Sequence, residues 1–155
     1  MKEIVKLLQE KNKTIATMES CTGGAISNEI TNIEGASDVL KYSAVTYSNE
    51  FKIKMGVNKD VIDKYSVYSI ETADEMSLNI SKFANSNYGV GITGKLNRVD
   101  KYNPYGEDNV VFISIYDKDN DKYYNEIVEA IKGSRKENKE LVIEKVIKML
   151  NKIIK

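Results

Sequence analysis

The sequence has 155 residues, a length typical of one domain with a single hydrophobic core. Its 23 basic residues balance 23 acidic ones, and 41% of the residues are hydrophobic, which is the composition of a globular protein. The neutral balance argues against binding to nucleic acid or to a membrane surface, since both normally depend on net positive charge. We therefore expect one domain over residues 1–155 that binds neither.

The sequence contains no histidine and one cysteine, Cys21. Ser-His-Asp and Cys-His catalysis within one chain is excluded, as are histidine-ligated and multi-cysteine metal sites. A general base must therefore be a lysine, an acidic residue or a tyrosine, and we expect no metal. A charged N-terminus, the lack of a long apolar run and the lone cysteine predict a cytoplasmic protein without a membrane span.

Hydrophobic spacing predicts the first elements of the chain. A helix over residues 1–12 is followed by a short buried strand over 14–18. A second helix is predicted over 22–33, and residues 39–48 have the β-branched and aromatic content of a strand. The segment 49–56 then predicts a short helix that ends at its glycine.

The second half adds helices, a strand and a hairpin. Asn58 and Ser69 are predicted to cap two successive helices, and residues 88–94 predict a buried strand with a glycine-rich exit. Two strands joined by the turn 117–121 predict a hairpin, and a helix from Ser134 to about Lys152 closes the chain.

This order of elements predicts an α/β fold: a three-layer α/β/α sandwich with a mixed, partly parallel sheet and a C-terminal β-hairpin and helix. In such sheets ligands bind beyond the carboxyl ends of the strands. Here those ends are the turns after Met18, Tyr47 and Thr93.

The stretch "TIATMESCTGG", residues 14–24, places two possible nucleophiles, Ser20 and Cys21, before a pair of glycines. Gly23 and Gly24 would let backbone amides approach an anion closely, but the stretch matches neither common phosphate-binding glycine motif. A turn that holds a ligand and a merely tight turn both remain open. Cys21 is more typical of a small buried apolar residue, because no histidine can activate it.

A second cluster, "EGASDVLKYSAVTYSNEFK", contains Ser37, Tyr47 and Lys52. A serine paired with a partly desolvated lysine can hydrolyse an amide without histidine, and a tyrosine can relay a proton or stabilise an oxyanion. The alternative is that Lys52 is an ordinary surface lysine of a helix.

The elements "ESCTGG", "GAS", "VTYSNEFKIKMGV" and "ITG", in this order, closely resemble the CinA C-terminal domain family of nicotinamide-nucleotide amidases. The resemblance runs from about Thr14 to the final helix. It implies hydrolysis of the carboxamide of nicotinamide mononucleotide to the acid and ammonia, without a metal or cofactor. It further implies Ser37 as the nucleophile, Lys52 as its base and Tyr47 as a third catalytic partner.

The same resemblance implies contacts with substrate. Thr93 would lie near the oxyanion, and Arg135 would clamp the phosphate with its planar fork of donors. The opening stretch becomes a substrate-holding turn formed by Ser20, Thr22, Gly23 and Gly24. Family members commonly self-associate, so a homo-oligomer is expected.

The sequence departs from the family after Thr93. The family continues with Ala-Gly-Pro and a glycine-rich loop, whereas residues from Lys95 to Tyr105 are bulky here. Bulky residues remove the close backbone approach that glycine allows. An alternative hypothesis is therefore a catalytically impaired nucleotide-binding or interaction module that kept the fold.

Overall fold

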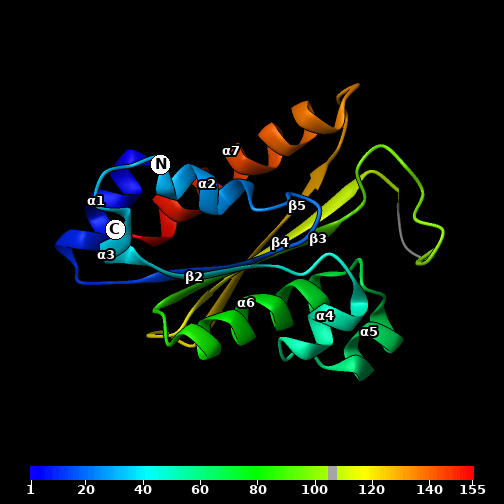
Figure 1. Ribbon diagram of the computed structural model, residues 1–155, viewed down its shortest axis with the longest axis horizontal. Helices are drawn as coiled ribbons and strands as arrows, with labels where there is room; N and C mark the ends of the chain where they lie inside the picture. Colours follow the sequence, from blue (N-terminus) through cyan, green and yellow to red (C-terminus); the bar gives the residue numbers. More distant parts are fainter. Residues whose placement is uncertain (105–107) are drawn as a thin grey trace.

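The computed structural model describes residues 1–104 and 108–155, and over this part of the chain five strands form one sheet (Figure 1). The strand order is β2-β1-β3-β4-β5. Strand β1 pairs in parallel with β2 and β3, while β3–β4 and β4–β5 are antiparallel. The predicted mixed sheet is confirmed. Its strands are β1 (Ile15–Glu19), β2 (Leu40–Val45), β3 (Tyr88–Gly94), β4 (Val110–Asp117) and β5 (Lys122–Glu129).

Helices cover both faces of the sheet, as the sandwich prediction requires (Figure 1). One face carries α1 (Lys2–Glu10), α2 (Ala25–Thr31), α3 (Ala36–Val39) and α7 (Arg135–Ile153), and the other carries α4 (Asn49–Lys54), α5 (Lys59–Tyr65) and α6 (Ile70–Ala84). Within the part of the chain that the structure describes, none of these helices is long and apolar enough to cross a membrane.

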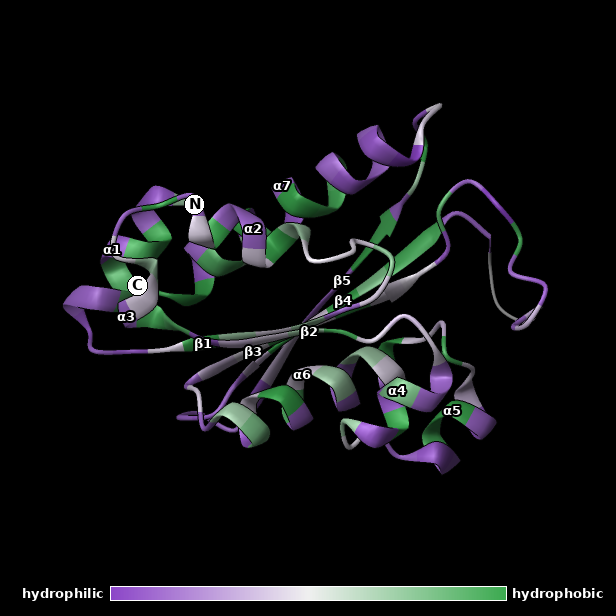
Figure 2. Ribbon diagram, in the orientation of Figure 1, coloured by the Kyte–Doolittle hydropathy of each residue, from purple (hydrophilic) through white to green (hydrophobic). Residues whose placement is uncertain are grey.

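Buried apolar residues form one core cluster on each face of the sheet, and the helices carry both hydrophobic and hydrophilic stretches (Figure 2). Val90 and Ile92 of β3 belong to the core beneath α1 and α7. The alternate residues face α6, where a Cβ added to Gly91 would lie 2.3 Å from the backbone oxygen of Ala73. The glycines of β3 therefore let α6 pack directly on the centre of the sheet.

The predicted helix starts are confirmed by their caps. The Asn58 side chain accepts a hydrogen bond from the Asp60 amide at 2.9 Å, and the Ser69 hydroxyl accepts one from the Thr72 amide at 3.1 Å. Ser134 begins α7 with a capping box. The short helix α3 was not predicted, and the strand expected over 39–48 is shorter, because Val39 ends α3.

Candidate functional site

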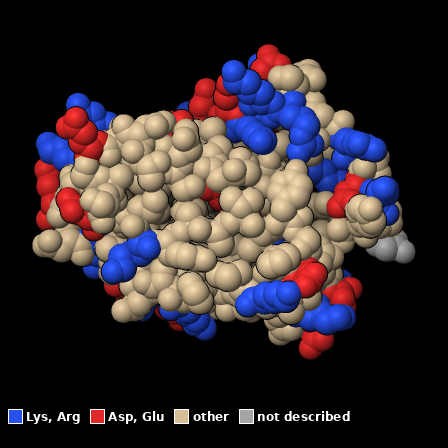
Figure 3. Space-filling model, in the orientation of Figure 1, with Lys and Arg blue, Asp and Glu red and all other residues tan. Residues whose placement is uncertain are grey.

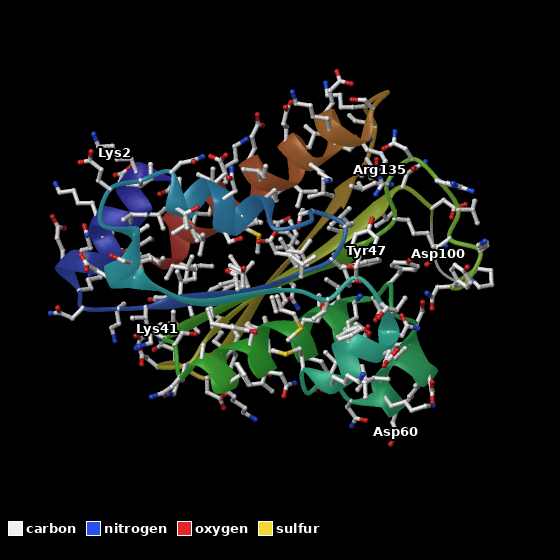
Figure 4. The ribbon with its side chains drawn as sticks, viewed as in Figure 1. Lys2, Lys41, Tyr47, Asp60, Asp100 and Arg135 are labelled. Atoms are coloured by element: carbon white, nitrogen blue, oxygen red, sulfur yellow. The ribbon has the colours of Figure 1, made fainter. Side chains whose placement is uncertain are left out.

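A cavity of about 750 Å³ opens at the carboxyl ends of β1, β2 and β3, the edge at which the sequence predicted a ligand site. The turn after β1, the segment after β2, the segment after β3 and the start of α7 all contribute to it. Figure 4 shows Tyr47, Asp100 and Arg135 together at this end of the molecule. The lining residues are Ser20, Cys21, Tyr47, Ser48, Asn49, Tyr68, Gly94, Lys95, Leu96, Arg98, Val99, Asp100, Lys101, Tyr102, Asn103 and Arg135.

A serine that lines this cavity contacts a buried lysine. The Lys52 Nζ lies 3.2 Å from the Ser20 Oγ and donates a 2.8 Å hydrogen bond to the backbone oxygen of Thr46. Ser20 follows β1, and Lys52 lies on α4, which follows β2. Because β1 and β2 are parallel neighbours, the segments after them emerge side by side. Ser20 lines the cavity, and Lys52 lies behind it.

Lys52 is only 2% exposed. Burial lowers its pKa from the ordinary 10.5 to about 8, although the nearby Cys21 and Asp100 oppose the shift. An accessible neutral form near neutral pH is what a lysine needs to accept a proton from a serine hydroxyl. The alternative that Lys52 is an ordinary surface lysine is therefore wrong.

Glu19 builds the turn that carries Ser20. Its fully buried carboxylate accepts hydrogen bonds from the Thr22 hydroxyl at 2.7 Å and from the amides of Ile26 and Ser27 at 3.1 and 3.0 Å. The Thr17 hydroxyl lies 3.3 Å from the same carboxylate. One side chain thus ties the end of β1 to the first turn of α2.

This arrangement corrects the expectation that the glycine-rich turn holds an anion. The first amides of α2 already bind the Glu19 carboxylate, so a phosphate there would meet a negative charge. The Gly23 amide donates to the backbone oxygen of Ser20 at 2.9 Å. Thr22, Gly23 and Gly24 are not among the residues that line the cavity. Of the predicted turn, only Ser20 reaches it.

We expect Glu19→Ala to lower the free energy of unfolding by about 2–4 kcal/mol, because it leaves several buried donors without an acceptor. Chemical denaturation followed by circular dichroism measures the loss. The matched control is Glu34→Ala, at an exposed position, which should change stability by less than about 0.5 kcal/mol. Equal stability of the two variants would remove Glu19 from this role.

The structure does not bring Ser37 to Lys52. Ser37 is exposed on α3, which precedes β2, whereas Tyr47 and Lys52 follow that strand. The six residues of β2 span about 20 Å at roughly 3.3 Å per residue. Ser37 and Lys52 therefore lie near opposite ends of this strand. Ser37 is also absent from the cavity lining. The expected Ser37–Lys52 pair is corrected to Ser20–Lys52.

Tyr47 and Arg135, which the sequence analysis assigned to one site, lie together in the structure. The Arg135 guanidinium donates to the Tyr47 hydroxyl oxygen at 3.2 Å and also donates to the backbone oxygen of Leu96. Both side chains line the cavity, and Tyr47 is 64% exposed. Because the tyrosine oxygen accepts from Arg135, its own O–H can donate to a ligand.

Thr93 and Cys21 have other surroundings than a reacting group requires. The Thr93 hydroxyl is fully buried and donates to the backbone oxygen of Val67 at 2.8 Å. Thr93 does not line the cavity, in which it was expected to lie near the oxyanion. Burial raises the pKa of Cys21 to about 12, which keeps the thiol neutral. Among the described residues no group of Cys, Asp or Glu side chains is arranged to hold a metal ion.

The divergent segment after β3 lines the cavity rather than filling it. The hydroxyl of Tyr68 donates to the Asp100 carboxylate, and the Asn49 amide donates to the Asn103 side chain at 2.8 Å. These two bonds tie the segment to α4 and to the connection between α5 and α6. The sequence pattern had drawn attention to Asn49 in the cluster that contains Tyr47 and Lys52, but not to Tyr68, Asp100 or Asn103 individually. Tyr105, the last residue of the predicted divergent stretch, lies outside the described residues.

The fold and cavity define a three-layer α/β domain with a buried lysine beside a serine at the carboxyl edge of its sheet. The chain belongs to the CinA C-terminal domain family, which it matches over residues 1–154. A competence-damage inducible protein of Thermoanaerobacter sp. strain X514 is 46% identical over 92 residues, 59% of this chain and 22% of that protein. A competence-damage inducible protein of Clostridium kluyveri strain DSM 555 is 38% identical over 120 residues, which are 76% of this chain and 29% of that protein. The chain thus spans less than a third of the length of these relatives.

Solved structures share the fold over nearly the whole chain. A competence/damage inducible protein named CihA from Agrobacterium tumefaciens superposes with a TM-score of 0.88 at 24% identity, covering 99% of this chain and 92% of that one. A CinA superfamily protein from Klebsiella pneumoniae 700603 gives a TM-score of 0.89 at 17% identity, covering 99% and 94%. At these identities the likeness concerns the fold.

Proposed function

We propose that the protein is a metal-independent amidohydrolase that converts nicotinamide mononucleotide to nicotinic acid mononucleotide and ammonia. The observation that carries the proposal is the buried Lys52 Nζ, 3.2 Å from the Oγ of Ser20, which lines a cavity. This pair supplies a nucleophile and a base without histidine. Resemblance to the nicotinamide-nucleotide amidases supplies the substrate.

In the proposed reaction neutral Lys52 accepts the proton of the Ser20 hydroxyl while the Oγ attacks the carboxamide carbon. The backbone oxygen of Thr46 holds the lysine amine in place by accepting a 2.8 Å hydrogen bond from it. The tetrahedral oxyanion accepts the Tyr47 O–H, whose oxygen Arg135 orients. The carbon–nitrogen bond breaks as Lys52 returns the proton to the leaving ammonia. Water then attacks the Ser20 ester with Lys52 again accepting a proton, which releases the acid and restores the serine.

We assign the phosphate to the basic residues that line the cavity. Arg98, Lys101 and Arg135 line it, and Figure 3 shows basic side chains gathered over the start of α7 and the segment after β3. An arginine that is already held by Leu96 and Tyr47 loses little conformational freedom on binding a phosphate. In this proposal these basic residues, and not the glycine-rich turn, bind the phosphate.

The purified protein is expected to release ammonia from nicotinamide mononucleotide in a glutamate dehydrogenase-coupled assay, with the acid mononucleotide as the second product. Free nicotinamide should be hydrolysed far more slowly, because it lacks the phosphoribosyl group that the basic residues bind. Absence of ammonia above a substrate-free blank would end the amidase proposal for this substrate.

The alternative is a nucleotide-binding module without turnover. The replacement of the family's glycine-rich loop by the bulky segment after Thr93 favours it. In that case the mononucleotide should raise the melting temperature of the protein while no acid product forms. Self-association, which the family resemblance implies, is proposed for either function and is measured by light scattering.

A further inference from the structure

One carboxylate lies within an otherwise basic cavity. Asp100 is the single acidic residue among the described residues that line it, whereas Lys95, Arg98, Lys101 and Arg135 are all basic. None of the ion pairs found within residues 1–104 and 108–155 includes Asp100. A negative charge at this place therefore needs an explanation beyond ion pairing within the chain.

Asp100 is held in place by hydrogen bonds. The Tyr68 hydroxyl and the Asn103 side-chain amide, at 3.0 Å, donate to one carboxylate oxygen, and the Tyr102 amide donates to the other at 2.9 Å. Burial raises the pKa of Asp100, but the hydrogen bonds from Tyr68, Asn103 and the backbone lower it by more, so the net pKa is below the ordinary value. The group is thus a fixed, ionised carboxylate.

The cavity lining carries charges of both signs. Asp100 lies in the sequence between the basic lining residues Arg98 and Lys101, and its charge also acts on the buried Lys52, whose Nζ lies 3.2 Å from the Ser20 Oγ. A ligand that fits this pattern has an anionic group and, near the bond that reacts, a positive charge. An N-ribosylated nicotinamide 5′-phosphate has both, because its pyridinium ring is cationic.

We propose that Asp100 is a specificity-determining residue that selects ligands whose carboxamide-bearing ring is positively charged. The inference rests on the proposed function, since it assumes that the carboxamide lies beside Ser20. The carboxylate attracts the pyridinium ring and offsets its repulsion by the protonated Lys52. A neutral ring of the same shape gains nothing from this charge.

The test compares binding of two ligands by isothermal titration calorimetry: nicotinamide mononucleotide and the 5′-phosphate of benzamide riboside, a neutral-ring isostere. Ser20→Ala serves as the background so that no turnover occurs. Asp100→Asn should weaken binding of the mononucleotide by about fivefold or more and change binding of the isostere by less than about twofold. Added salt should reduce the difference between the effects of Asp100→Asn on the affinities of the two ligands.

Tyr68→Phe is the matched control, because it removes an anchor of the same segment and leaves the charge. It should affect both ligands equally. If Asp100→Asn weakened the binding of both ligands equally, the inference would be overturned. Failure of both ligands to bind the Ser20→Ala background protein would overturn it as well. Ring-charge selectivity without ammonia release from the wild-type protein would refute the amidase function alone. Ammonia release without that selectivity would refute the role of Asp100 alone.

Discussion

Ser20→Ala is expected to abolish the release of ammonia from nicotinamide mononucleotide, whereas Ser37→Ala is expected to leave it nearly unchanged. Removal of the attacking oxygen from a serine hydrolase lowers kcat by roughly 10³-fold or more. Ser37 lies at an exposed position of α3, at the opposite end of β2 from Lys52, so its hydroxyl cannot replace that of Ser20. Initial rates of ammonia formation measure both effects.

The two serine variants also serve as controls for each other. Both should keep the wild-type melting temperature to within a few degrees, because each change removes a single oxygen atom. Loss of activity in Ser37→Ala with full activity in Ser20→Ala would reverse the assignment and return the nucleophile to α3.

Lys52→Met is expected to eliminate activity and at the same time to stabilise the fold. Burial of the ammonium lowers the Lys52 pKa to about 8, so at neutral pH the protein bears the cost of a buried charge. Methionine retains much of the volume without the charge, and we expect a gain of about 1–3 kcal/mol in the free energy of unfolding at pH 7. Urea denaturation measures this gain.

The pH dependence follows from the same shift. In the wild type, the rate should rise with pH and level off above about pH 8, where the folded-state Lys52 is neutral. The stability gap between Lys52→Met and wild type is largest below about pH 8. It shrinks as the pH rises toward 10.5, because the unfolded chain still binds the proton that the folded chain has lost.

Lys54→Met provides the control on the same helix. Its ammonium is exposed and pairs with Glu50, so the change should alter stability by less than about 0.5 kcal/mol and leave the rate profile unchanged. A rate profile without an acidic limb in the wild type, or full activity of Lys52→Met, would contradict the assignment of Lys52 as the base.

Much of the fold could be predicted because most of its elements leave a local signal in the sequence. The caps at Asn58 and Ser69, the buried strand β3 and the terminal hairpin are encoded by short-range patterns that the structure repeats. The helix α3 left no such signal. It has four residues, and its start is set by the positive φ of Gly35 and by packing against α1.

The site was less predictable because it depends on which strands are neighbours. Once β1 and β2 are known to be parallel, Ser20 and Lys52 must emerge at one edge and Ser37 at the other. The family resemblance instead paired Ser37 with Lys52, to which Ser37 is also nearer along the chain. The pocket role of Asp100 could not be predicted at all, since it requires the contact of Tyr68 with a segment 32 residues further along the chain.

The anchors of the segment after β3 have a consequence for how this domain can change. The proposed bond-breaking groups come from residues before position 55, and the groups assigned to recognition come from the segment after β3 and the start of α7. Among the described residues, side-chain hydrogen bonds of Asn49 with Asn103 and of Tyr47 with Arg135 join the two parts, and Tyr68, from the connection between α5 and α6, anchors Asp100. A recognition segment transplanted between relatives should therefore carry its ligand preference with it, and the amide-cleaving apparatus beneath should accept the exchange.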